Sequence, residues 1–145
     1  MHLLGVGIYV KDSPKAVELY KSAFGLELGY HVLNDDGTYF HSELMKDGQG
    51  FCSVVEERDA ECPGYNPVEL GYTFKTREEL ERAFSVLKAK GTVKLDLCEL
   101  PWSPCAAIVI DCFGVRWYLT LPQHKPADDW SPEKDKQEDG GDQLC

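Results

Sequence analysis

The chain lacks a long apolar run, an excess of basic residues and the start of a secretory signal. No stretch approaches the roughly 20 apolar residues that span a bilayer, so no membrane segment is expected. Residues 1–5 lack a basic start followed by a long apolar segment, which predicts a cytoplasmic protein. A formal net charge of −10 disfavours nucleic-acid binding, because contacts with phosphates need clustered lysine and arginine.

Close cysteine pairs and the common catalytic motifs are also missing. The six cysteines are scattered without a Cys-x-x-Cys motif, so neither a disulfide framework nor a zinc site built from them is expected. The chain carries no Ser-His-Asp pattern, phosphate loop or dinucleotide fingerprint. No catalytic residue can therefore be named, and no cofactor is predicted.

Part of the acidity lies at the C-terminal end. Residues 124–145 hold seven acidic residues and three lysines, and this composition predicts a disordered tail in which Trp130 is exposed. Acidity of this kind keeps a protein soluble, and it could also attract a cationic ligand. Charge alone does not decide between these interpretations.

The composition that remains is that of one globular domain, with 43% hydrophobic residues in 145. The first half alternates as a strand over 4–10 and continues as a helix. Asp12 is the candidate cap of that helix, Pro14 is suited to its first turn, and Gly25 is suited to its end. Strands are predicted over 26–33, 38–45 and 51–56. Asn34-Asp35-Asp36-Gly37 forms the hairpin turn between the first two.

The second half repeats this order after a polar linker over 57–66. A strand over 68–74 leads to Thr76-x-x-Glu79, a capping box that predicts the start of a helix, and Gly91 is expected to close that helix. Strands follow over 92–98, 105–111 and 115–121. We therefore expect an α+β domain over 1–123, in which two βαβββ modules, 1–56 and 67–123, form a curved mixed sheet around a cavity.

Three segments resemble a known family in their order and spacing. They are Ile-Tyr-Val-Lys-Asp at 8–12 with the helix that ends in Phe24-Gly25, Asp-Gly-Thr-Tyr-Phe-His-Ser-Glu-Leu at 36–44, and Ile-Asp-Cys-Phe-Gly-Val-Arg-Trp at 110–117. Together they resemble the glyoxalase/bleomycin-resistance/dioxygenase superfamily, whose members are also called vicinal oxygen chelate proteins. The second segment is similar to its PhnB-like branch. The resemblance covers roughly residues 3–122.

The resemblance implies a metal centre whose ligands project from the first and last strands of each half. Residue by residue, these positions correspond to Gly5, Ser53, Glu69 and Tyr118. A catalytic divalent ion needs about three ligands such as histidine or carboxylate, and only Glu69 is an ordinary one. The family's usual metal chemistry is therefore not expected here.

Strand alternation separates a face under the helices from a face toward the cavity. Side chains on the cavity face are predicted to include Tyr9, Glu69, Thr73, Arg116, Tyr118 and Thr120. Such a set could orient a polar organic molecule. Alternatively, Glu69 and Arg116 simply pair with each other.

Trp102 lies between two prolines in a loop that the superfamily often places beside the pocket mouth, where it could stack on a planar ligand or cover the core. A weaker metal candidate is His31, His41 and Glu43 around the hairpin turn. A three-residue loop would place the two histidines opposite each other, and a two-residue loop would not. An ordinary polar hairpin is the alternative.

Three functions remain open. The first is a metal-free small-molecule binding protein that sequesters a toxic or antibiotic compound, as bleomycin-resistance proteins do between two subunits. The alternative is a metal-dependent lyase, isomerase or dioxygenase with displaced ligands, and the third is a structural or regulatory module. The nearly empty ligand set favours the first over the second, and the polar cavity set with Trp102 favours it over the third. The resemblance also implies a homodimer.

Overall fold

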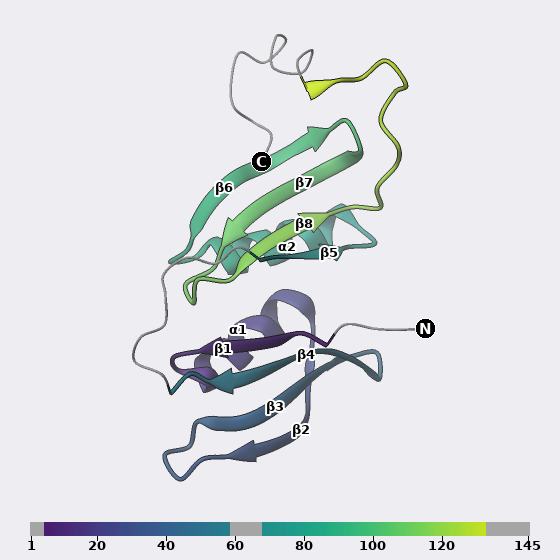
Figure 1. Cartoon of the computed structure of the whole chain (residues 1–145). Helices are drawn as coiled ribbons and strands as arrows, with labels where there is room; N and C mark the ends of the chain where they lie inside the picture. The colour runs from purple at the N-terminus through teal and green to yellow at the C-terminus, as the bar shows by residue number, and fades with distance from the viewer. Residues whose placement is uncertain (1–4, 59–67, 133–145) are drawn as a thin grey trace.

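The computed structural model describes residues 5–58 and 68–132, which form two successive βαβββ halves (Figure 1). The first half consists of β1 (Gly7–Val10), α1 (Ser13–Phe24), β2 (Glu27–Leu33), β3 (Tyr39–Lys46) and β4 (Gln49–Glu56). The second consists of β5 (Glu69–Thr73), α2 (Arg77–Lys88), β6 (Thr92–Leu100), β7 (Ser103–Ile110) and β8 (Arg116–Thr120). The predicted order of elements and the α+β class are confirmed.

Each half contributes a four-stranded mixed sheet with the same topology. The strand orders are β1-β4-β3-β2 and β5-β8-β7-β6. β1 pairs with β4 and β5 with β8 in parallel, and the other pairs are antiparallel. Figure 1 shows the edge strands β1 and β5 facing each other, with α1 and α2 behind the sheets. Within the described ranges no strand pairing joins β1 to β5, so the expected curved sheet consists of two sheets.

The two halves share one hydrophobic core around the ring of Phe24 at the end of α1. This ring lies 4.8 Å from Trp117 of β8 and 6.0 Å from Phe74 after β5, measured between ring centroids. It also lies 5.1 Å from Phe51 in its own half. Aromatic contacts at these separations add to the burial of apolar area, so the halves stabilise each other.

A buried carboxylate, Asp111, also joins the halves. Only 3% of its surface is exposed, and it lies in the turn before β8. One oxygen accepts hydrogen bonds from the hydroxyl of Tyr20 in α1 (2.8 Å) and the indole of Trp117 (2.9 Å). The other accepts from the backbone N–H groups of Phe113 (2.9 Å) and Val115 (3.1 Å). Burial and the nearby Asp111 raise the pKa of Tyr20, so its phenol remains a donor.

The start of α1 differs from the prediction. Asp12 occupies the N-cap position, but its backbone is left-handed (φ 65°, ψ 60°) and its side chain makes no cap hydrogen bond. The carboxylate of Glu56, at the end of β4, accepts hydrogen bonds from the N–H groups of Asp12 (3.0 Å) and Ser13 (2.6 Å) instead. The orphan donors of the helix are therefore satisfied by a residue more than 40 positions away.

Replacing Glu56 by glutamine is expected to lower the free energy of unfolding by about 1 kcal/mol at pH 7, the usual contribution of a helix cap. Partial burial raises the pKa of Glu56, but the hydrogen bonds from Ser13 and Asp12 outweigh it and hold that pKa below the ordinary 4.5. The stabilisation is therefore fully present above pH 4.5 and is lost as the pH falls through the lower pKa of the folded state.

Urea unfolding of both proteins across this pH range checks the prediction. The difference between wild type and Glu56→Gln should shrink as the pH falls below 4.5. A difference that stays constant at acid pH would mean that the charge of Glu56 does not act on α1.

The two ends of α2 follow different rules. The cap at its start is confirmed, because the side chain of Thr76 accepts a hydrogen bond from the N–H of Glu79 (3.2 Å). At the other end the left-handed residue is Lys90 (φ 60°), and Gly91 closes the last turn through its N–H, which donates to the carbonyl oxygen of Lys88 (2.9 Å). Gly91 is needed for another reason: a Cβ there would collide with the carbonyl oxygen of Ile110.

The segment after β8 is described as far as residue 132. Trp130 is half-buried, and its ring centroid lies 5.6 Å from that of Trp102 in an edge-to-face arrangement. The prediction that Trp130 is exposed is therefore wrong. Residues 133–145 of the predicted tail and residues 59–66 of the linker lie outside the described residues, so those boundaries stay predictions.

Candidate ligand-binding face

The candidate site lies on the open face, which we define as the side of both sheets opposite α1 and α2. Along β1, Ile8 and Val10 are buried under the helices, whereas Tyr9 points away from them and is 61% exposed. Along β8, Trp117 and Leu119 are buried in the shared core. The predicted strand alternation therefore correctly separates the two faces of these strands.

The positions that the resemblance assigns to a metal are equivalent in the two halves. Gly5 lies two residues before Gly7, and Gly7 pairs with Ser53 of β4. In the same way, Glu69 lies two residues before Gly71, and Gly71 pairs with Tyr118 of β8. This set offers one carboxylate, two neutral hydroxyls and no side chain at Gly5, so the residues present do not fit a divalent metal centre.

The one carboxylate in this set is held by a guanidinium group. Nε of Arg116 donates to Oε2 of Glu69 at 2.6 Å, across the paired strands β5 and β8. The side chains are 30% and 35% exposed, so the pair lies at the surface of the open face. The predicted alternative, in which these two residues pair, is thus what the structure contains. A cation supplied by the chain itself neutralises Glu69.

Trp102 and Tyr118 form the second polar contact of this face. The indole N–H of Trp102 donates to the hydroxyl of Tyr118 (3.0 Å), which in turn donates to the side-chain oxygen of Gln123 (3.3 Å). Beside them lies a small apolar cluster that consists of Leu95, Leu100, Ala106 and Ile108. Trp102 packs against this cluster, so it covers a local core while part of its ring stays accessible.

Two predicted members lie elsewhere. Thr120 is only 1% exposed and shares a hydrogen bond of 2.7 Å with Ser103, so the prediction that it faces a ligand is wrong. Thr73 lines a different cavity at the end of β5, together with Phe51 and Lys75. The structure therefore brings together Glu69 with Arg116 and Trp102 with Tyr118, but not Thr73.

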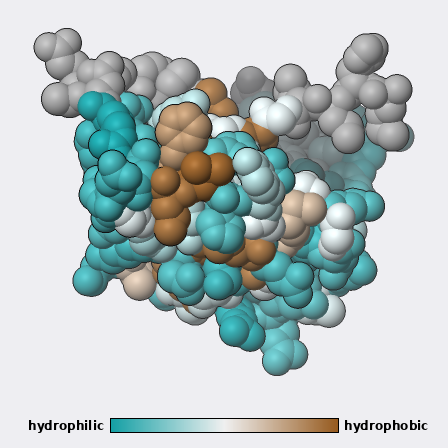
Figure 2. All heavy atoms as spheres, turned by 90° about the horizontal axis from the view of Figure 1, so that it is seen from below, coloured by the Kyte–Doolittle hydropathy of each residue, from teal (hydrophilic) through white to brown (hydrophobic). Residues whose placement is uncertain are grey.

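The open face of the first sheet carries aromatic residues. Tyr9, Tyr30 and Phe40 are 61%, 67% and 65% exposed. Tyr9 and Phe40 line a cavity of about 480 Å³ with His41, and the ring of His41 lies 6.1 Å from that of Tyr30. Figure 2, seen from the side of the first half, shows hydrophobic side chains gathered among hydrophilic ones. Neither Tyr30 nor Phe40 is among the residues predicted from the sequence to face a ligand.

A β-bulge explains why Phe40 lies on the open face and why the predicted histidine cluster does not form. The hairpin loop is the three-residue kind, since Asn34 N–H donates to the carbonyl of Thr38 (2.8 Å). The register then shifts by one residue between Leu33 and Val32, opposite Phe40. Phe40 joins the open face, although simple alternation would have turned it under the helix.

The same shift separates the two histidines. His31 pairs with Ser42, and His41 pairs with Val32, so the histidines lie on opposite faces of the hairpin. His41 contacts Glu43 at 3.3 Å, without His31. Within residues 5–58 and 68–132, no group of three histidine, cysteine or acidic side chains is placed to hold a metal ion. The His31, His41 and Glu43 site is therefore not assembled.

A crease between β1 and β5 connects the two halves of the open face. It contains a cavity of about 530 Å³, lined by residues 5–9, residues 68–70 and Val115. Tyr9 and Glu69 both belong to this lining. An organic molecule in the crease would therefore contact an aromatic ring of the first half and the ion pair of the second.

Solved structures share this fold at low sequence identity. A PhnB protein from Bacillus cereus has a TM-score of 0.72 and 23% identity, over 83% of this chain and 99% of its own. Protein PA1353 from Pseudomonas aeruginosa has a TM-score of 0.69 and 19% identity, over 83% and 98%. The fosfomycin resistance protein FosX from Listeria monocytogenes, solved with Mn(II) and sulfate, has a TM-score of 0.61 and 13% identity, over 94% and 96%.

No curated protein sequence matches the chain. None of the described helices is long and apolar enough to cross a membrane. The family model named Glyoxalase/Bleomycin resistance protein/Dioxygenase superfamily matches residues 2–119, which include both helices and every strand except the last residue of β8, Thr120. With this match and the shared fold, the chain belongs to the glyoxalase/bleomycin resistance protein/dioxygenase superfamily.

Proposed function

We propose that this chain is a metal-free small-molecule binding protein that holds a planar organic compound on its open face and thereby sequesters a toxic or antibiotic molecule. The observation that carries the proposal is the contact between Arg116 and Glu69. At the position where the family places a metal ligand, the only carboxylate already has a cationic partner. The open face can therefore bind the polar groups of a ligand through its own side chains, without a metal ion.

Aromatic side chains would supply most of the contact area. Tyr9 and Phe40 are exposed in the first half, and Trp102 remains partly accessible in the second. Such rings stack on planar ligands at a low cost in conformational entropy. The net charge of −10 would attract a cationic compound over longer distances.

The proposal includes a homodimer that acts in the cytoplasm. Exposed Tyr30 and Phe40 leave apolar area on the first sheet that a second chain would cover, and the family resemblance implies pairing. Four cysteines of the described segments are free thiols, which suits a reducing compartment.

Native mass spectrometry with bleomycin as the probe tests the proposal. We expect a dimer that retains bleomycin and retains no stoichiometric Mn(II) or Zn(II) when these ions are added. Trp102→Ala should weaken bleomycin binding about tenfold, which corresponds to the loss of one aromatic contact. Trp102→Phe is the matched control, because it keeps a ring at the same place and should retain most of the affinity.

Three results would overturn parts of the proposal. One metal ion per chain that is retained by wild type and lost in Glu69→Ala would establish a metal centre. A monomer would remove the pairing. No retention of bleomycin, or equal retention by wild type and Trp102→Ala, would remove the sequestering role on this face.

A further inference from the structure

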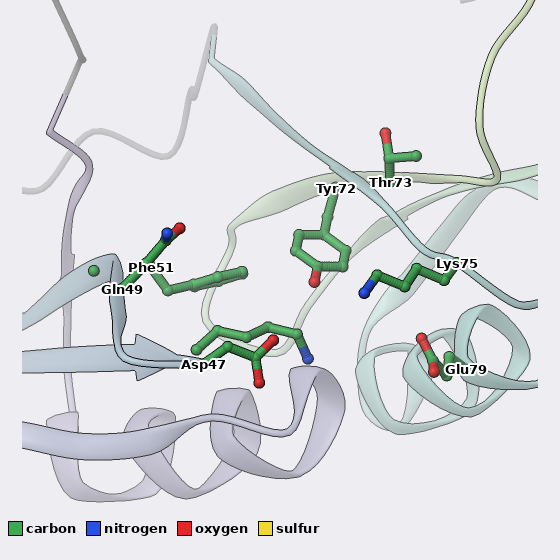
Figure 3. Close-up of a pocket in the computed structure, with 9 residues that line it drawn as sticks. Asp47, Gln49, Phe51, Tyr72, Thr73, Lys75 and Glu79 are labelled. Carbon is green, nitrogen blue, oxygen red and sulfur yellow. The ribbon is translucent and has the colours of Figure 1, made fainter.

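A third cavity lies at the junction between the start of β4 and the end of β5 (Figure 3). Its volume is about 630 Å³. The lining combines a turn of the first half with the β5–α2 connection of the second: Lys46, Asp47, Gln49, Gly50, Phe51, Tyr72, Thr73, Lys75 and Glu79. Of these residues, only Thr73 was predicted from the sequence to face a ligand.

Two aromatic rings form the apolar part of this cavity. The ring centroids of Phe51 and Tyr72 lie 5.4 Å apart, and both rings pack against Phe24 in the core. Burial, followed by the charges of Glu79 and Asp47, raises the pKa of Tyr72, so the phenol is neutral at physiological pH. Both rings are therefore held in place by the core while they line the cavity.

Two lysines supply positive charge. Nζ of Lys46 donates to the carbonyl oxygen of Phe24 (2.5 Å) and lies 5.9 Å from the centroid of the Tyr72 ring. An ammonium group has three donors, so two of its N–H bonds stay available. Lys75 makes no hydrogen bond or ion pair with the described part of the chain. Figure 3 shows the Lys75 amine directed toward the Tyr72 side chain.

Two carboxylates line the same space. Asp47 belongs to the β3–β4 turn, and Glu79 belongs to the first turn of α2. Neither carboxylate forms an ion pair with a described residue, although both lysines line this cavity. The cavity thus presents two positive and two negative groups that are not paired with each other, around a pair of aromatic rings.

We propose that this cavity binds a small zwitterion of the amino-acid class that carries an aromatic side chain. The ring packs on Phe51 and Tyr72, and the carboxylate accepts hydrogen bonds from Lys75 and Lys46. The ammonium group faces the carboxylates of Asp47 and Glu79. A simple anion would be repelled by these carboxylates, and a simple cation by the lysines, so a ligand with both charges matches the lining best. This site stands independently of the open face.

Three probes that share one ring test the charge requirement: L-phenylalanine, 3-phenylpropionate and 2-phenylethylamine. The first carries both charges, and each of the others carries one. Isothermal titration calorimetry on the full chain should show L-phenylalanine binding at least about tenfold more tightly than either single-charge probe, since each loses one charge-assisted contact.

Lys75→Met keeps the length of the side chain and removes its charge, and it should weaken L-phenylalanine binding about tenfold. Lys94→Met is the matched control, because Lys94 is exposed on β6 and outside the cavity, and it should bind as wild type does. Both lysines are exposed, so equal melting temperatures would show that the fold is kept.

The outcomes separate the proposal from its alternatives. No binding of L-phenylalanine overturns the site. Equal binding of 3-phenylpropionate and L-phenylalanine overturns the zwitterion class, because the carboxylates would then contribute nothing. An unchanged affinity in Lys75→Met would place L-phenylalanine elsewhere on the protein. None of these results depends on whether bleomycin binds the open face.

Discussion

Replacing Asp111 by alanine should lower the free energy of unfolding by at least about 3 kcal/mol, because it leaves several buried donors without an acceptor. The side chain accepts four hydrogen bonds, two from the side chains of Tyr20 and Trp117 and two from backbone N–H groups. Tyr20 is itself fully buried, so water cannot replace the lost acceptor without opening the core. Chemical denaturation followed by circular dichroism measures the loss.

Two milder variants show whether the acceptor is responsible. Tyr20→Phe removes one of the four donors and should cost about 1 kcal/mol. Asp111→Asn keeps the shape of the side chain but turns an N–H group toward donors. Its loss in the free energy of unfolding should lie between those of Tyr20→Phe and Asp111→Ala. If Asp111→Ala lost no more free energy of unfolding than Tyr20→Phe, the carboxylate of Asp111 would not hold the two halves together as its hydrogen bonds indicate.

Gly91→Ala should destabilise the protein by about 1–3 kcal/mol, the usual cost of overpacking. The new methyl group would collide with the carbonyl oxygen of Ile110 and lie 2.9 Å from that of Leu87. Both obstacles are backbone atoms, so α2 and β7 would have to move apart. Thermal or urea unfolding gives the difference from wild type.

Gly50→Ala serves as the control for that substitution. Gly50 lies in β4 with an ordinary negative φ, and a Cβ there meets nothing within 4 Å. Its effect should stay within about 0.5 kcal/mol, as for most surface substitutions. Equal effects of the two alanines would mean that Gly91 contributes only its backbone entropy and not a close approach.

Local signals predicted the architecture well. Hydrophobic alternation placed the strands, and Thr76 capped α2 as its spacing with Glu79 required. The interactions that could not be predicted have partners that are distant in the sequence. The cap of α1 comes from Glu56 on another strand, and Gly91 is fixed by contact with Ile110. Such contacts exist only after the chain has folded, so no local pattern contains them.

The candidate face could be predicted only where strands are regular. In β5 and β8 the alternation holds, and it correctly placed Glu69, Arg116 and Tyr118 on one side. In the hairpin of β2 and β3 a single bulge moved Phe40 to the open face and separated His31 from His41. A bulge changes the parity of every residue beyond it, and pairing between strands determines where it forms.

The positions of the three tryptophans give the protein two separate optical reporters. Trp117 is buried and hydrogen-bonded to Asp111, so its fluorescence follows the integrity of the fold. Trp102 donates to Tyr118 on the open face and lies edge to face with Trp130, so an aromatic compound bound there as proposed would quench their emission. Tryptophan fluorescence can therefore report both binding of such a compound and unfolding, without an attached dye. The two events would change the emission of different tryptophans.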